Sequence, residues 1–343
     1  MPPTRHQTIK DVAERAQVST ATVSRVINGT GKVHAKTAAR VTKVLEELGY
    51  VPNAWARAMA TDDSDLMGLI VPDILNPFFA AIYSGLNETA KHRGLAVWMV
   101  DSADDPEQER QALLMLGRYR AQGIIITPAH PAANLAAIER IGTPVCLVDR
   151  RLAKNLWDLV LIDNVNGARQ AAQLFVASGH QRIGIIAGPQ NSTPGVERLQ
   201  GFRDALAQEG LEMPQQYVKL GDFRQESGFS LGRELLAMGE PPTAIFSCNN
   251  LMTMGLLQAI HSYPGAILGE TVAVIGFDDI PISTLTDPPL TVVSRPMKEM
   301  GVQAAQLIMA RMETPEKPQE TVVLGPQLVI RGSEKIAGLL RWI

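Results

Sequence analysis

Residues 8–29 have the sequence TIKDVAERAQVSTATVSRVING, whose apolar spacing predicts two short helices joined by a tight turn. Thr8 and Asp11 are spaced as a capping box at the start of the first helix, and Ser19 is placed to cap the second. The inward stripes of the two helices consist of Ile9, Val12, Ala13 and Ala16, and of Val23, Val26 and Ile27. This arrangement predicts a helix-turn-helix.

The outward face of the second helix carries small polar side chains, a methyl group and one arginine. Small side chains let a helix enter the major groove of DNA, a methyl group contacts thymine, and a guanidinium binds guanine or phosphate. The residues of this region that we expect to contact DNA are Thr8, Ser19, Thr20, Ala21, Thr22, Ser24, Arg25 and Asn28. The alternative is a purely structural helical hairpin.

A third helix is predicted from about His34 to Leu48, with Gly49 as its stop, and closes a small core. Residues 51–60, VPNAWARAMA, follow it. Their helix spans only about two turns, which is too short to persist alone. We therefore expect it to fold only against a partner.

The charge of the chain is unevenly distributed. Residues 1–60 carry nine Lys or Arg and four Asp or Glu, a net charge of +5, whereas the whole chain carries −3. The remaining residues therefore carry −8. Such a division confines the attraction for phosphate to one end of the chain, which favours DNA as its partner.

Beyond a polar joint at 62–65, short apolar strands alternate with amphipathic helices. The predicted strands are 66–72, 96–101, 123–127, 145–149, 160–162, 182–187, 217–220, 244–247, 272–277 and 291–294. The predicted helices include 77–92, 107–120, 168–177, 196–209 and 226–238. This alternation predicts parallel sheets covered by helices on both faces, and the length of 343 residues fits two such lobes.

Polar side chains follow many of these strands, where ligands bind in open α/β sheets. Those at the strand ends are Asp73, Asp149, Asn249, Asn250, Asp278 and Asp279, and the loop after the first strand adds Asn76, Phe78 and Phe79. Acceptors beside aromatic rings suit a sugar, whose hydroxyls donate and whose C–H face stacks. A single carboxylate at a strand end is often only a helix cap, so the predicted cleft rests on the whole set.

An enzyme is not predicted. Gly228–Gly232 fits G-x-S-x-G but lies within a helical pattern instead of a strand-to-helix turn, and Gly31-Lys32 lacks the rest of a phosphate loop. The six histidines are scattered with no pair at metal-ligand spacing, so we expect neither a metal nor a cofactor.

A cytoplasmic location is predicted from three features. Cys146 and Cys248 sit at predicted buried strands without metal-ligand neighbours, which indicates reduced core thiols. No apolar run reaches membrane-spanning length, and residues 1–7 lead into the first helix without a signal sequence. We expect no membrane partner.

Three motifs make the chain resemble the LacI/GalR family of bacterial transcription regulators: TVSRVING at 22–29, ELGYVPN at 47–53 and Ala-Arg at 56–57. In that family the hinge helices of two subunits pair in the minor groove and insert an apolar side chain, usually leucine, into a base step. The resemblance places Met59 at this position and makes Asn53 and Ala56 further hinge contacts to DNA. Methionine is also an unbranched apolar wedge.

The resemblance covers nearly the whole chain and implies the fold class. It is an N-terminal all-α helix-turn-helix headpiece plus an α/β bilobed body like a periplasmic binding protein, with two doubly wound parallel-sheet lobes. We expect the chain to cross between lobes near Ile162, Leu290 and Thr321. The expected divisions are residues 1–50 for the headpiece, 51–63 for the hinge helix and linker, 64–162 and 291–321 for the N-terminal lobe, 163–290 and 322–335 for the C-terminal lobe, and 336–343 for a short tail.

The resemblance also assigns cleft residues. It implies that an effector is held by Asp149, Arg198, Asn249 and Asp278, with Phe223 packed against it. Arg295 departs from the glutamine common at its place in the family. An inward Arg295 favours an effector with a carboxylate or phosphate, because an unpaired buried guanidinium is costly, whereas an outward Arg295 favours a neutral sugar.

These features together predict a transcription regulator that binds a pseudo-palindromic operator as a homodimer. A small effector between the lobes changes the spacing of the hinges, which fold only when close together. A repressor with a carbohydrate effector is the expected case, and a corepressor mode with a purine-like ligand is the alternative. A sugar-binding protein without a DNA role is the rival from another class.

Overall fold

A computed structural model describes residues 7–50 and 64–337, apart from the side chain of Asn28. The chain forms two compact units that divide between Ser64 and Asp65. The predicted DNA contacts Asn53, Ala56 and Met59 and the end of the tail lie outside the described residues.

The first unit is a three-helix headpiece of α1 (Ile9–Ala16), α2 (Thr20–Asn28) and α3 (Ala35–Leu48). Both predicted caps are present: Thr8 forms a capping box with Asp11, and the Ser19 hydroxyl accepts from the Thr22 N–H at 3.1 Å. The inward stripes meet in one small core, in which Val23 is fully buried. The structure therefore confirms the helix-turn-helix.

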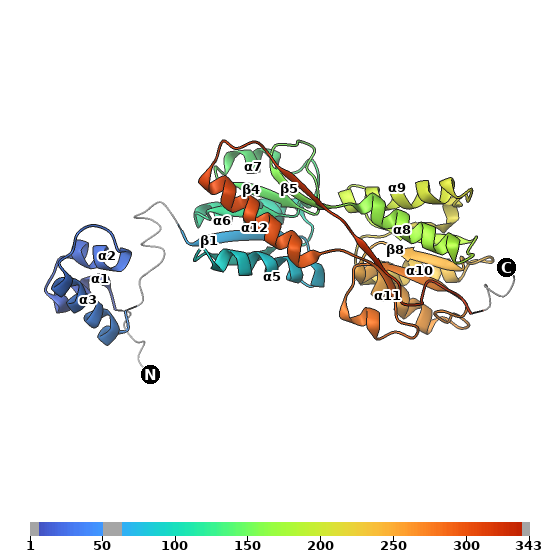
Figure 1. Cartoon of the computed structure of the whole chain (residues 1–343), viewed down its shortest axis with the longest axis horizontal. Coiled ribbons are helices and arrows are strands. Elements are labelled where there is room, and N and C mark those ends of the chain that lie inside the picture. The colour runs from blue at the N-terminus through green and yellow to red at the C-terminus, as the bar shows by residue number, and fades with distance from the viewer. Residues whose placement is uncertain (1–6, 51–63, 338–343) are drawn as a thin grey trace. The chain divides into compact units, whose positions relative to one another are not determined.

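The first lobe of the second unit is a parallel sheet between two helix layers (Figure 1). Its strands lie in the order β11 (Thr321–Leu324), β5 (Asp158–Ile162), β4 (Val145–Val148), β3 (Gly123–Ile126), β1 (Leu66–Val71) and β2 (Ala96–Asp101). The layers are α5 (Pro77–Lys91) with α12 (Met297–Glu313), and α6 (Pro106–Arg118) with α7 (Leu135–Arg140). A Cβ on Gly85 would lie 2.0 Å from the Lys298 carbonyl oxygen, so glycine is what lets α5 and α12 pack this closely.

The second lobe has the same layered plan. Its strands lie in the order β12 (Gln327–Val329), β10 (Thr291–Ser294), β9 (Ala273–Phe277), β8 (Ala244–Ser247), β6 (Ile183–Ala187) and β7 (Val218–Leu220). The helices are α8 (Asn164–Ala177), α9 (Thr193–Gln208), α10 (Gln225–Leu236) and α11 (Asn250–Ser262). Only β12 runs antiparallel among the described strands of this sheet.

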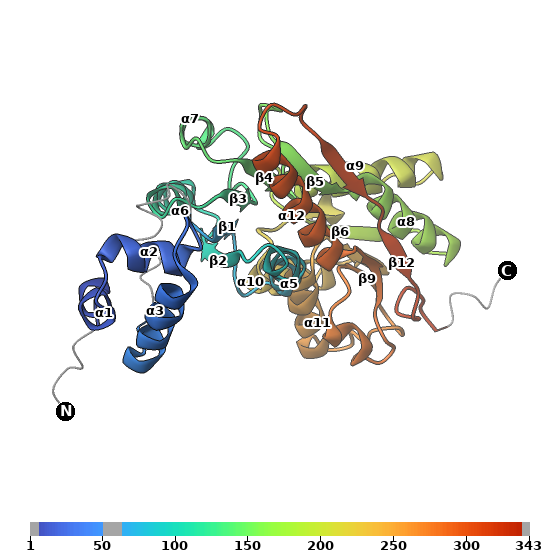
Figure 2. The same cartoon turned by 60° about the vertical axis from the view of Figure 1, so that its left-hand side comes forward.

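Two predicted crossing points need correction. The segment Thr291–Ser294 pairs in parallel with β9, so it belongs to the second lobe, and the chain crosses after Ser294 instead of near Leu290. The segment Thr321–Leu324 pairs with β5 of the first lobe, so the last crossing follows Leu324 instead of Thr321. Figure 1 and Figure 2 show this last segment, in dark red, running from one lobe to the other. None of the described helices is long and apolar enough to cross a membrane.

Candidate functional site

The outer face of α2 is the first candidate surface. Thr20, Ala21 and Arg25 are exposed, and Arg25 forms no ion pair with any described residue. Ser19 and Thr22 are engaged with each other, because their hydroxyl oxygens lie 2.9 Å apart. Small side chains therefore stand at the start of α2 and the exposed Arg25 in its last turn, an arrangement compatible with a groove-binding helix.

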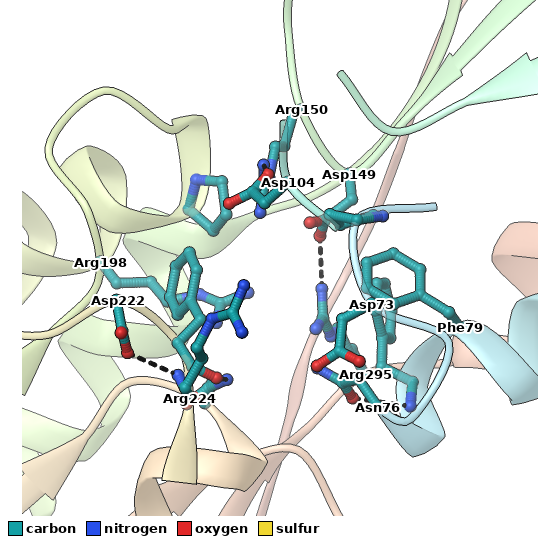
Figure 3. A pocket seen from close by; sticks show the side chains of 15 residues that line it. Asp73, Asn76, Phe79, Asp104, Asp149, Arg150, Arg198, Asp222, Arg224 and Arg295 are labelled. Atoms are coloured by element: carbon teal, nitrogen blue, oxygen red, sulfur yellow. Dashed lines mark hydrogen bonds and ion pairs between the residues drawn. The ribbon is translucent and has the colours of Figure 1, made fainter. Parts of the chain in front are cut away.

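The second candidate surface is a cleft between the two lobes, at the carboxyl ends of their strands (Figure 3). It encloses about 500 Å³, including space open to solvent. Its walls are formed by Pro72, Asp73, Asn76, Phe78, Phe79, Asp104, Asp149, Arg150, Pro194, Arg198, Asp222, Phe223, Arg224, Asn249 and Arg295. Polar, charged and aromatic side chains thus surround one shared space.

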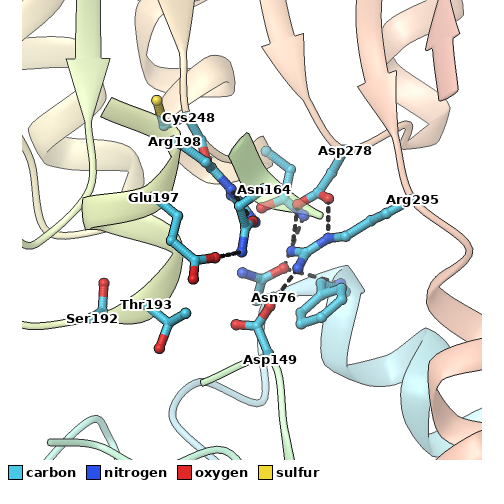
Figure 4. Close-up of polar contacts among 12 residues, drawn as sticks. Asn76, Asp149, Asn164, Ser192, Thr193, Glu197, Arg198, Cys248, Asp278 and Arg295 are labelled. Carbon is cyan, nitrogen blue, oxygen red and sulfur yellow. Dashed lines mark hydrogen bonds and ion pairs between the residues drawn. The ribbon is translucent and has the colours of Figure 1, made fainter. Parts of the chain in front are cut away.

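Arg295 lies at the centre of the cleft floor and bridges two carboxylates (Figure 4). Its Nε donates to Asp278 Oδ1 at 2.5 Å, its Nη2 to Asp278 Oδ2 at 3.1 Å, and its Nη1 to Asp149 Oδ1 at 2.5 Å. The guanidinium also lies over the Phe78 ring, 3.4 Å from the ring centre. The outward alternative for Arg295 is therefore wrong, and its inward charge is already paired.

The pKa of Arg295 reflects this pairing. Burial alone lowers the pKa of a guanidinium, but the carboxylates of Asp278 and Asp149 outweigh burial and raise the pKa of Arg295 above its ordinary value. Arg295 is 7% exposed, so solvent screens these contacts only weakly.

The two carboxylates occupy unusual backbone conformations. Asp149 directly follows β4 and has φ of 68°, and Asp278 directly follows β9 and has φ of 78°. Residues other than glycine rarely adopt this left-handed backbone conformation, although aspartate tolerates it better than most. Such strain is typical of positions held for a binding function, since the surrounding structure must maintain it.

Arg198 is also buried in the cleft, and no carboxylate forms an ion pair with it among the described residues. Its Nε donates to Asn164 Oδ1 at 2.8 Å, its Nη1 donates to the Cys248 carbonyl at 2.5 Å, and its guanidinium lies 3.5 Å from the Phe277 ring centre. Burial and the nearby positive charge of Arg295 lower the pKa of Arg198, Asp278 and Asp149 act in the opposite direction, and the net result is a pKa of about 10. Its Nη2 has no acceptor in the part of the chain that the structure describes.

Two asparagines of the predicted set are engaged in structural contacts. Asn76 caps α5 and its Oδ1 accepts from Asn250 Nδ2 at 2.9 Å, which joins the two lobes. Asn249 caps α11 by accepting from the Met252 N–H at 2.9 Å, and its Nδ2 donates to the Phe223 carbonyl at 2.8 Å. Their amides therefore hold the cleft walls in place.

Aromatic rings line both walls. Phe79 packs against Phe78 with ring centres 4.8 Å apart, and Phe223 lies on the opposite lobe. The Phe223 ring occupies the space that a side chain at Gly188 would fill, since a Cβ there would lie 2.1 Å from the ring. The glycine thereby lets the ring pack against the end of β6.

The structure brings most predicted effector residues together. The cleft contains Asp73, Asn76, Phe78, Phe79, Asp149, Arg198, Phe223, Asn249 and Arg295. Asp278 lies behind them and reaches the cleft through Arg295.

Four charged lining residues were not predicted: Asp104, Arg150, Asp222 and Arg224. Asp104 follows β2, and Asp222 and Arg224 follow β7. The strand-end rule applied to these two strands would have identified them. Arg150 is adjacent to Asp149 and pairs with Asp104 at 2.6 Å.

Known proteins resemble this chain over both units. Residues 8–53 match the family of bacterial regulatory proteins, lacI family, and residues 64–326 match the periplasmic binding proteins and sugar binding domain of LacI family. The HTH-type transcriptional repressor CytR of Escherichia coli K12 is 34% identical, with 96% of each chain covered. The HTH-type transcriptional regulator CelR of Thermobifida fusca is also 34% identical, covering 96% of this chain and 98% of the relative.

Solved structures agree. A transcriptional regulator CelR–cellobiose complex matches with a TM-score of 0.73 at 32% identity, covering 95% of this chain and 99% of that one. The Lac repressor dimer bound to operator and the anti-inducer ONPF matches with a TM-score of 0.82 at 26% identity. The match covers 96% of this chain and 100% of that chain. The headpiece, the bilobed body and these matches together show that the chain belongs to the LacI family of DNA-binding transcriptional regulators.

Proposed function

We propose that this regulator is a cytoplasmic repressor that binds a pseudo-palindromic operator as a homodimer and releases or tightens its hold when a small carbohydrate-type effector enters the cleft. The observation that carries the proposal is the bridged cleft floor. Arg295 joins Asp149 of one lobe to Asp278 of the other, and Asn76 joins Asn250 across the same gap. A molecule bound among these groups changes the contacts of both lobes at once, which is the physical requirement for control by a ligand.

The DNA half of the proposal uses α2 as the recognition helix. Thr20, Ala21 and Arg25 are its exposed side chains, and Ser24 lies between them on the same helix. In this proposal Arg25 contacts a guanine or a phosphate, while the small side chains let the backbone approach the groove. The hinge residues Asn53, Ala56 and Met59 complete the contact through the minor groove.

The effector half uses the rings and the remaining polar groups of the cleft. Phe79 and Phe223 offer stacking faces on opposite walls, and Asp73 offers a carboxylate acceptor. The solved CelR relative was obtained as a cellobiose complex, which supports a carbohydrate in the corresponding body. The relatives are transcriptional regulators, which supports a binding role without catalysis.

The first experiment tests DNA binding. Selection from random duplexes should recover a two-fold related sequence, and fluorescence anisotropy should then show tighter binding to that duplex than to a scrambled one. Failure to enrich any sequence, with or without added metabolites, would disprove the repressor assignment.

The second experiment tests the cleft. The variant Asp73→Ala should lose the thermal shift produced by an effector found in a screen of sugars, sugar acids, sugar phosphates and purines, while its operator binding persists. Asp204→Ala, which removes an exposed carboxylate on α9, is the matched control and should respond as the original chain does. An unchanged response in Asp73→Ala would place the effector elsewhere.

A further inference from the structure

The cleft has few free acceptors on its floor, because Arg295 engages both strand-end carboxylates. Asp278 receives two hydrogen bonds from Arg295, and Asp149 receives one. The Asn76 and Asn249 side-chain oxygens are occupied by helix caps. A neutral sugar depends on such acceptors to bind its hydroxyl donors. On this floor Arg295 already occupies three of the four carboxylate oxygens, and breaking that buried ion pair to free them would be strongly unfavourable.

The second-lobe wall, in contrast, has donors without acceptors. Arg198 is 1% exposed, yet its Nη2 lacks a hydrogen-bond partner within residues 7–50 and 64–337. A buried guanidinium donor that is left unsatisfied lowers stability, so a ligand that accepts from it gains affinity.

Arg224 adds a second cation to the same wall. It follows β7 and lines the cleft, and its guanidinium forms no hydrogen bond or ion pair with another described residue, since its hydrogen bonds are made by its backbone N–H and carbonyl. That carboxylate oxygen also accepts from the Ser227 hydroxyl, so it is turned toward its own loop. Figure 3 shows Arg198 and Arg224 on one side of the pocket and Asp73, Asp149 and Arg295 on the other.

The charges of the floor balance one another without Arg224. Arg295 and Arg198 face Asp149 and Asp278, which leaves this group of four neutral. Arg150 pairs with Asp104 at 2.6 Å. Arg224 is thus an additional cation over the open space, with the Asp222 carboxylate of its own loop beside it, while Asp73 remains as an acceptor on the opposite wall.

We infer that the effector of this cleft is an acidic sugar, whose carboxylate or phosphate accepts hydrogen bonds from Arg198 and Arg224 and whose hydroxyls face Asp73. The inference rests on the proposed function, since it names the class of effector. Arg295 is not the partner of the anion. Its role is to neutralise the two carboxylates that would otherwise repel an acid and attract a neutral sugar.

The test compares matched sugars on the full chain. Thermal shift and calorimetric titration are measured with D-glucose, D-glucuronate and glucose 6-phosphate, and with D-galactose and D-galacturonate. The acidic members should stabilise the protein and the neutral members should not, and the glucuronate and phosphate arms distinguish the two sources of the anion. The stabilisation should weaken as the salt concentration rises.

Two variants, each of which removes one positive charge, show whether the anion binds at Arg224. Arg224→Gln should weaken binding of the acidic sugar roughly 10- to 100-fold, the range for losing a hydrogen bond to a charged group. Arg233→Gln lies on α10 outside the cleft lining and should leave this affinity unchanged. Both side chains are exposed, so both variants should fold.

Several outcomes would overturn the inference. They are a neutral sugar that binds as tightly as its acid, an equal loss in the two variants, and the absence of stabilisation by every acidic probe at millimolar concentration. Operator binding is measured on the same samples. A protein that binds its operator and responds only to neutral sugars refutes the inference and leaves the proposed function intact, whereas a protein that binds no operator refutes the proposed function.

Discussion

The headpiece and the cleft use arginine in opposite ways. In the headpiece Arg25 is exposed and has no ion pair among the described residues, and the ion pair of Arg15 with Glu47 is long, at 3.7 Å, and exposed. In the cleft Arg295 is 7% exposed and holds two carboxylates at 2.5 Å. The same side chain therefore serves one surface as a free charge and the other as a structural connector.

The difference follows from what each surface must recognise. A DNA backbone is a dense line of negative charge, and attraction over a Debye length requires cations that are not neutralised within the protein. A cleft acts only at contact distance, where a buried unpaired charge would destabilise the fold. An exposed arginine such as Arg25 can therefore remain without a protein partner, whereas a buried one needs carboxylates, as Arg295 has, or neutral acceptors and a ring, as Arg198 has.

The largest expected effect on stability comes from removing the buried arginine of the cleft, Arg295. Arg295→Met leaves Asp149 and Asp278 buried without their cation, and it should lower the free energy of unfolding of the body by about 3–5 kcal/mol. Denaturant titration followed by circular dichroism measures the change.

Arg331→Met is the matched control. Arg331 pairs with Asp279 at 2.6 Å, but both side chains are partly exposed, at 19% and 28%. Its replacement should therefore lower stability by about 1 kcal/mol or less. Equal losses in the two variants would show that burial does not set the strength of these pairs.

The next prediction is that the small core of the headpiece unfolds independently of the body. Val23→Ala removes two methyl groups from a fully buried site of the headpiece and should lower its stability by about 2–3 kcal/mol. Operator binding should be lost at a lower temperature while the thermal transition of the body stays in place. Val274→Ala, at a fully buried site of β9, should shift the body transition and leave the headpiece unchanged. A single shared transition in both variants would contradict two separate units.

A smaller effect, on the free energy of DNA binding, is expected from removing the exposed arginine of the headpiece, Arg25. Arg25→Ala should weaken binding to the selected operator by about 1–3 kcal/mol if it contacts a base edge. Arg40→Ala, an exposed arginine on α3, removes the same charge and should weaken binding to operator and scrambled duplex equally. Anisotropy over a range of salt concentrations measures both. An equal loss on the two duplexes for Arg25→Ala would assign Arg25 to a phosphate.

The smallest effect concerns a buried imidazole of the second lobe. Burial lowers the pKa of His180 below its ordinary value of 6.5, although the Glu334 carbonyl acts in the opposite direction. A lowered folded pKa stabilises the protein above the unfolded pKa, and this stability is lost as the pH falls through the folded value. Urea midpoints of the body should therefore decline from about pH 7 to about pH 5.5, and His180→Gln should flatten that decline. A decline of the same slope in the variant would assign it to other groups.

Much of this fold was predictable because local signals and tertiary structure agree. The helix-turn-helix follows from its caps and apolar stripes, and Asp149 and Asp278 were found because they directly follow buried strands. The strands β11 and β12 were missed because they are only four and three residues long, although most of their residues are apolar.

The orientation of Arg295 was not predictable. It depends on a carboxylate 146 positions away in the sequence, and no local pattern specifies such a contact. Arg224 was missed for a different reason, since it lies four residues beyond Leu220, the end of a strand whose following loop was not searched for polar side chains.

The last crossing of the chain limits how the two lobes can move. Only Gly325 and Pro326 separate β11, which is hydrogen-bonded into one sheet, from β12, which is hydrogen-bonded into the other. So short a tether resists pulling the lobes apart but permits rotation about itself, and Gly325 has open space where its side chain would be. Ligand-driven motion in this regulator should accordingly be a swivel of nearly rigid halves about a pivot beside the cleft.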